Sequence, residues 1–245
     1  TPCFVSTGCA DPWYDASGAI RAVDPCQKSG VPLNAQYDQL CAGSQALGLT
    51  ITDRQAQQLA DYVVLIEKWN RSINLVSRQD TDRLISRHVL DSLSVSHLLK
   101  GKVVVDVGTG AGLPGVPLAI VNPERAFTLC DRMAKRVRFL QVVKSQLQLS
   151  NVKLVEQDLA QAKSWSTPAD TILARAVAPA ATLWPLLEPG LAIDGRVLVF
   201  SSTQAPEANI TEQGDEACSP YRCRPETLAI PGLSQPHHVD ILERH

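Results

Sequence analysis

The chain has 245 residues, 44% of them hydrophobic, and a formal net charge of −2. This length and hydrophobic content suffice for one large domain, or for one domain with a small appendage. The charge excludes a polycation that binds nucleic acid over its whole surface, so only local clusters of cations could do so. No apolar run approaches the ~18 residues of a membrane span, and no cysteine pair has zinc-site spacing, so we expect neither a membrane nor a metal partner. Seven scattered cysteines fit reduced thiols in a cytoplasmic protein.

The N-terminal part of the chain divides into two segments. Residues 1–43 hold four of the seven cysteines and little periodicity, so we expect a weakly ordered extension. Residues 44–100 form a predicted helical region in which order begins at Thr52. Thr52 and Gln55 have the spacing of a capping box. Apolar residues at helical spacing then predict a helix through Asn70, with Trp69 in the core, and a second helix is expected to begin at Asp80 as its N-cap.

The third segment, residues 101–245, alternates predicted strands and helices. Strands are expected at 102–107, 126–131, 152–156, 170–174 and 195–201, and helices at 113–121 and 133–149. Pro179, Pro185 and Pro189 predict a short or irregular helix before the fifth strand. Residues 202–225 are expected to be loop-like, and two late strands near 226–230 and 238–242 flank a Pro231-Gly232 turn. This order indicates an α/β fold with a mainly parallel sheet and an antiparallel edge, preceded by N-terminal helices.

A glycine-rich stretch, VVVDVGTGAGLPG at 103–115, is the strongest sign of a ligand site. Its glycines permit positive φ and close approach of a bound molecule at the end of a strand. Gly110, Gly112 and Gly115 match a dinucleotide fingerprint, whereas Gly108 follows the strand directly. Asp106 can order the loop amides or accept from a cofactor ammonium group. A nicotinamide cofactor, S-adenosylmethionine and a tight turn without a ligand all remain open from these residues.

Asp131 ends the second predicted strand and is a candidate acceptor for both hydroxyls of a ribose. An acidic residue at this place serves nicotinamide enzymes as well, so it indicates a ribose without identifying the cofactor. Its alternative role is to cap the helix that follows.

Five segments occur in an order that resembles one protein family: LIEKWNRSINLVSRQD, RHVLDSL, VVDVGTGAGLPGVPLAIVNPE, FTLCDRMAKRVRFL and ARAVAP. Together they are similar to the RsmG (GidB) family of bacterial 16S rRNA guanine-N7 methyltransferases, over about residues 47–242. The resemblance implies a Rossmann-like S-adenosylmethionine-dependent methyltransferase fold. It also implies cofactor contacts at Gly108, Leu113, Leu159, Ala160 and Arg175, beside the candidates Asp106, Gly110, Gly112 and Asp131 that the loop and strand ends provide.

The implied substrate is 16S rRNA in the small ribosomal subunit or its precursor. Methylation of guanine N7 uses a free lone pair, so a positioning group is expected rather than a general base, and Arg175 is the candidate. Its alternative role is an ion pair at the sheet edge. Candidate RNA-binding residues are Arg71, Arg87, His88, Lys135, Arg136 and Arg138. The alternatives are a solvated helix face for the cations, and packing or capping for His88 and Asp91.

This chain departs from the family pattern at three places. Ala160 stands where an acidic residue is frequent, Ser201 and Ser202 replace a lysine-glycine pair, and His237-His238 replaces an arginine-histidine pair. We expect these changes to affect RNA affinity or rate more than the fold. A nicotinamide-dependent dehydrogenase and a non-catalytic RNA- or ribosome-binding module remain alternative functions.

Overall fold

The computed structural model describes residues 33–77, 83–158, 167–201 and 220–245. Within these residues, seven strands form one sheet in the order β3-β2-β1-β4-β5-β7-β6. The first five strands run parallel, whereas β7 pairs antiparallel with β5 and β6 pairs antiparallel with β7. The expected α/β fold with an antiparallel edge is therefore confirmed. The strands are β1 (Val103–Val107), β2 (Ala126–Asp131), β3 (Val152–Glu156), β4 (Ala169–Arg175), β5 (Leu191–Ser201), β6 (Arg222–Leu228) and β7 (His237–Glu243).

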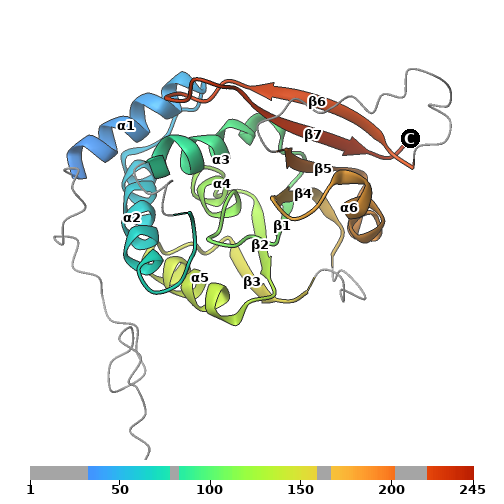
Figure 1. Cartoon of the computed structure of the whole chain (residues 1–245), viewed down its shortest axis with the longest axis horizontal. Coiled ribbons are helices and arrows are strands. Elements are labelled where there is room, and N and C mark those ends of the chain that lie inside the picture. The colour runs from blue at the N-terminus through green and yellow to red at the C-terminus, as the bar shows by residue number, and fades with distance from the viewer. Residues whose placement is uncertain (1–32, 78–82, 159–166, 202–219) are drawn as a thin grey trace, which may run out of the picture.

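Helices cover the two faces of the sheet unequally (Figure 1). Helices α4 (Gly115–Val121) and α5 (Ala134–Gln146) pack on one face, and α2 (Asp53–Asn70) packs on both of them. Helix α6 (Ala180–Leu187) packs on β5 and β7 from the other side. Neighbouring strand residues alternate between the faces. Leu173 thus belongs to the larger core under the N-terminal helices, while Ile172 belongs to the smaller core under α6.

The N-terminal region begins earlier than the sequence predicts. The capping box of Thr52 and Gln55 is present and starts α2 as expected. Trp69, 5% exposed, packs on Phe139 with ring centroids 5.6 Å apart, so its predicted core position is confirmed. The expectation that order begins at Thr52 is wrong, because helix α1 (Leu33–Ala46) precedes it and buries Leu40 completely. Residues 1–32 lie outside the described part of the chain.

A π-helix, η2 (Ile85–Leu90), precedes the short helix α3 (Asp91–Ser94) and the 3-10 turn η3 (Ser96–Leu98). The predicted apolar face of Ile85, Val89 and Leu93 is buried as expected. The predicted N-cap Asp80 lies outside the described residues. A π-helix inside a longer helical run shifts the backbone by one residue and is frequent at functional sites.

The C-terminal strands differ from their predicted bounds. Strand β5 begins at Leu191, directly after the 3-10 turn η5 (Glu188–Gly190), rather than at residue 195. Strand β6 begins at Arg222, inside a segment predicted to be loop. Its first four side chains are exposed, so they lack the apolar alternation from which strands are predicted. Backbone pairing with β7 sets this edge strand instead.

Candidate functional site

The glycine loop connects the carboxyl end of β1 to α4. Gly108, Gly110 and Gly112 have φ values of +65°, +60° and +95°, in the left-handed region that glycine tolerates best. A methyl group on Gly110 would meet nothing closer than 3.8 Å, so this backbone faces open space. A methyl group on Gly115 would clash with the side chains of Leu129 and Asp106. Gly110 thus leaves room for a ligand, whereas Gly115 permits packing of α4 against the sheet.

Asp106 is fully buried beneath this loop. Its Oδ2 accepts from the Thr109 hydroxyl at 2.6 Å and from the Gly115 amide at 2.9 Å. Burial raises the pKa of the Asp106 carboxyl to about 7, against the opposing effect of these two hydrogen bonds. The loop-ordering role expected for Asp106 is present, while its contact with a cofactor stays a prediction.

Asp131 joins the end of β2 to the same loop. Its Oδ2 accepts from the Gly110 amide at 2.9 Å, and its Oδ1 accepts from the Met133 amide, just before α5, at 2.8 Å. The Arg136 guanidinium lies 3.3 Å from Oδ2. The alternative role predicted for Asp131, as the N-cap of the next helix, is wrong: the N-cap of α5 is Met133, whose amide Asp131 binds, and no side chain caps this helix. Each carboxylate oxygen can accept two hydrogen bonds, so Oδ2 is fully used and one position on Oδ1 remains for a ribose hydroxyl.

Tyr62 of α2 is a supporting residue that the sequence did not reveal. Its buried hydroxyl donates to the carbonyl of Ala111, inside the glycine loop, at 2.7 Å. Burial raises the pKa of Tyr62 well above its usual value, so the hydroxyl remains a donor. The only signal was a polar tip within an apolar helix stripe, and a buried tyrosine usually finds a partner for its hydroxyl.

A cavity of about 790 Å³ opens beside the loop, on the sheet face opposite α4 and α5. Gly108 and Asp131 line it, as do Val177 after β4 and Cys130 on β2. Burial raises the pKa of the Cys130 thiol to about 12, so this group stays protonated. Leu113 is buried outside the residues that line this cavity, and the predicted contacts Leu159 and Ala160 lie outside the described residues.

Arg175 is the last residue of β4. Its side chain points toward η2, on the face of the sheet opposite the cavity. Its Nη2 lies 2.9 Å from Asp91 Oδ2 and donates to the Arg87 carbonyl at 3.1 Å. His88 Nδ1 lies 3.2 Å from the same nitrogen. Arg87, His88 and Asp91 of the RHVLDSL segment thus gather around Arg175. The ion pair that was one of its two predicted roles is present, and Arg175 is not among the residues that line the cavity.

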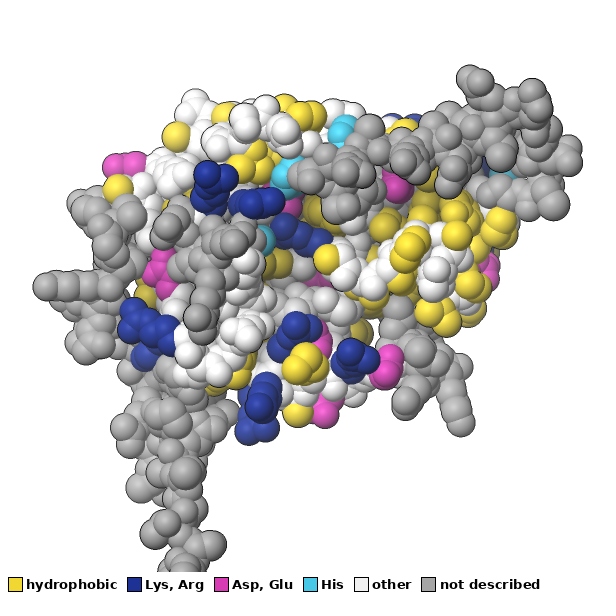
Figure 2. Space-filling view, in the orientation of Figure 1, with side chains coloured by type: hydrophobic (Ala, Val, Ile, Leu, Met, Phe, Trp, Pro, Cys, Tyr) yellow, Lys and Arg dark blue, Asp and Glu magenta, His cyan; other side chains and the backbone are white. Residues whose placement is uncertain are grey.

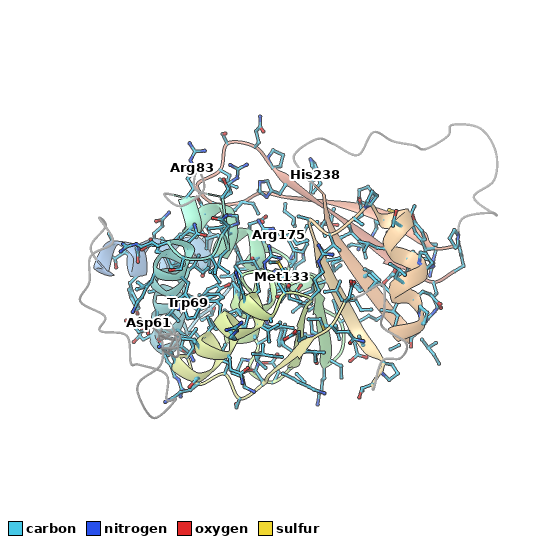
Figure 3. All side chains as sticks on the ribbon, turned by 60° about the horizontal axis from the view of Figure 1, so that its bottom comes forward. Asp61, Trp69, Arg83, Met133, Arg175 and His238 are labelled. Carbon is cyan, nitrogen blue, oxygen red and sulfur yellow. The ribbon has the colours of Figure 1, made fainter. Side chains whose placement is uncertain are left out.

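The predicted RNA-binding cations differ in exposure. Arg71, Lys135 and Arg138 are exposed, while Arg87, His88 and Arg136 are half-buried. Lys and Arg side chains gather around a hollow on one face of the molecule (Figure 2). Figure 3 places Arg175 between His238 of β7 and Met133 at the start of α5. Among the described side chains, no group of three or more His, Cys, Asp or Glu is arranged to hold a metal ion. None of the described helices is long and apolar enough to span a bilayer.

Comparison with known proteins identifies relatives over most of the chain. The family model GidB, described as rRNA small subunit methyltransferase G, matches residues 55–236. The protein named ribosomal RNA small subunit methyltransferase G from Alteromonas mediterranea is 38% identical over 205 residues, covering 84% of this chain and 95% of that protein. The protein of the same name from Erwinia tasmaniensis is 38% identical over 213 residues, covering 85% of this chain and 99% of that protein.

A solved structure supports the fold alone. Magnesium protoporphyrin IX methyltransferase from Synechocystis, with bound SAH, aligns with a TM-score of 0.50 at 18% identity, covering 78% of this chain and all of that one. The Rossmann-like methyltransferase fold implied by the sequence motifs is confirmed.

Proposed function

Because the chain belongs to the rRNA small subunit methyltransferase G family, we propose that it transfers a methyl group from S-adenosylmethionine to N7 of a guanine in 16S rRNA. One observation carries the proposal beyond family membership. The Gly110 backbone faces open space while the buried carboxylates Asp106 and Asp131 hold the loop on either side. Such a loop, at the carboxyl ends of parallel strands, is the position where this class of sheet binds its ligands.

The residues present fit S-adenosylmethionine. The cavity of about 790 Å³ has a size typical of cofactor sites, and the Asp131 carboxylate on its wall can accept from a ribose hydroxyl. Asp106, Gly108, Gly110, Gly112 and Leu113 form or support the loop against which the cofactor would lie. We retain Leu159, Ala160 and Arg175 as proposed contacts from the family resemblance. When bound, the cofactor supplies an electrophilic methyl group on a sulfonium.

The chemistry demands little acid–base assistance from the protein. Guanine N7 carries a free lone pair at neutral pH, so the task of the protein is to hold this atom in line with the methyl carbon. Arg175 is the proposed positioning residue. The charge of Arg175 acts to lower the pKa of the Asp106 carboxyl, against the larger effect of burial. Its guanidinium also sits 5.9 Å from the Phe200 ring centroid, which limits its movement.

The proposed partner is 16S rRNA within the small ribosomal subunit or its precursor, which would place the protein in the cytoplasm. Cations bind RNA phosphates without reading sequence, and unstacked bases supply the specificity. The proposed RNA-binding residues are Arg71, Arg87, His88, Lys135, Arg136 and Arg138.

The decisive experiment measures transfer of a labelled methyl group to small subunits from a strain that lacks this modification, followed by mapping of the modified base. We expect label at N7 of a single guanine. Failure of intact, cofactor-bound protein to label these subunits would favour a non-catalytic ribosome-binding module. Calorimetric binding of NAD without binding of S-adenosylmethionine would favour a dehydrogenase.

A pair of charge-reversal variants tests the RNA-binding surface. The double variant Lys135→Glu, Arg138→Glu changes two exposed cations of α5. We expect it to raise the Kd for small subunits at least tenfold and to flatten the salt dependence. The matched control, Lys100→Glu, Lys102→Glu, makes the same charge change at the amino end of β1 and should leave the Kd within twofold. Equal effects of the two variants would assign the loss to net charge alone.

A further inference from the structure

The carboxylate of Asp91 links three parts of the chain. Its Oδ2 faces Arg175 of β4 at 2.9 Å, and its Oδ1 lies 2.7 Å from Nδ1 of His237, the first residue of β7. The Asp91 side chain is 2% exposed, so it depends on these partners for its charge. His237 therefore binds the same Asp91 carboxylate that binds Arg175. The sequence marked His237 only as a departure from the family pattern.

Resting on the proposed function, we propose that His237 is a positioning residue for Arg175 and acts through Asp91. An imidazole that carries a proton on Nδ1 donates it to Asp91 Oδ1. Fixing one carboxylate oxygen leaves the other oriented toward Nη2, so the guanidinium keeps one position.

Other polar groups lie near the cluster, and their effects must be distinguished from that of His237. His88 and Arg87 of η2 approach Arg175 through the His88 ring and the Arg87 carbonyl. Asp106, whose carboxyl has its pKa raised to about 7 by burial, acts on the glycine loop. A comparison in which only residue 237 changes keeps all three of these groups constant.

Two substitutions test this hydrogen bond. His237→Asn keeps an N–H donor near the position of Nδ1, while His237→Leu removes the donor. We expect His237→Leu to lower kcat at least tenfold and His237→Asn to keep kcat within threefold of wild type.

The control variant is His97→Asn, which alters an exposed histidine of η3 and should keep the wild-type kcat. Wild-type kcat in His237→Leu would overturn the positioning role. A kcat of His237→Asn as low as that of His237→Leu would overturn the role of the hydrogen bond to Asp91.

A measurement without RNA distinguishes this inference from the proposed function. The ¹⁵N signals of the Arg175 Nη atoms report rotation of the guanidinium. They should be resolved in wild type and in His237→Asn, and averaged in His237→Leu. If wild type fails to methylate small subunits, the proposed function fails, but this pattern would still support the positioning of Arg175. Identical spectra for all three proteins would overturn it.

Discussion

The hydroxyl of Tyr62 connects the N-terminal region to the glycine loop, and its removal tests whether that contact shapes the site. Tyr62→Phe deletes one oxygen and its 2.7 Å hydrogen bond to the Ala111 carbonyl. A neutral hydrogen bond contributes about 1 kcal/mol net, and a buried carbonyl left without its donor costs about 1–3 kcal/mol. We therefore expect the free energy of unfolding to fall by about 1–3 kcal/mol.

The same substitution should weaken cofactor binding, because Ala111 lies between Gly110 and Gly112. If about 1 kcal/mol of loop ordering is lost, the Kd for S-adenosylmethionine rises about fivefold. Urea unfolding and titration calorimetry measure the two effects. The matched control is Tyr37→Phe, which removes a phenol contact to Asp53 at the other end of the N-terminal region and should leave the Kd unchanged. A loss of stability with an unchanged Kd in Tyr62→Phe would refute the proposed link to the loop.

Three further predictions concern the buried charges. Asp131→Ala removes the acceptor for the Gly110 and Met133 amides. Calorimetry should show cofactor binding weaker by ~1–3 kcal/mol, and an unchanged affinity would mean that Asp131 only orders the backbone around it. The pKa of Asp106 is about 7 in the folded protein, against 3.8 for an aspartate exposed to water. The folded state therefore retains a proton that the unfolded chain releases, and stability should fall as pH rises from 4 to 7, by at most about 4 kcal/mol. Urea unfolding of Asp106→Asn, which cannot ionise, should lack this slope; an equal slope in both proteins would contradict the assignment. Arg175→Lys keeps a cation for Asp91, so turnover should fall at least tenfold while the Tm stays within a few degrees. If turnover and Tm fell together, the role of Arg175 would be limited to a structural ion pair with Asp91.

The strands around the site were predictable because their signals are local. Three valines precede Asp106, and glycines follow directly, so β1 and its loop were placed from the sequence. Helix α2 was predicted from a capping box and an apolar stripe for the same reason. Helix α1 was missed because the buried polar residues Gln36 and Ser44 interrupt its apolar pattern.

The contacts that complete the site join residues far apart in sequence. Tyr62 meets a carbonyl 49 residues later, and His237 meets a carboxylate 146 residues earlier. Such long separations leave no periodic pattern in the sequence, so the partners of Tyr62 and His237 could not be predicted. The π-helix η2 was also unpredictable, because an irregular hydrogen-bond pattern leaves no mark in the order of apolar residues.

The contact of Tyr62 with the loop bears on how this chain can be recombined with its relatives. Residues 44–100 and 101–245 were predicted as separate regions, yet α2 supplies a buried donor to the loop and α3 supplies the Asp91 carboxylate to β4 and β7. A chimera that exchanges the N-terminal helices alone would combine partners from two different proteins at both points. A functional chimera therefore has to take Tyr62 and the glycine loop from the same parent protein. It also has to take Asp91, Arg175 and residue 237 from one parent. The residues that must be exchanged together at this site are those in contact with one another, and they do not form a continuous segment.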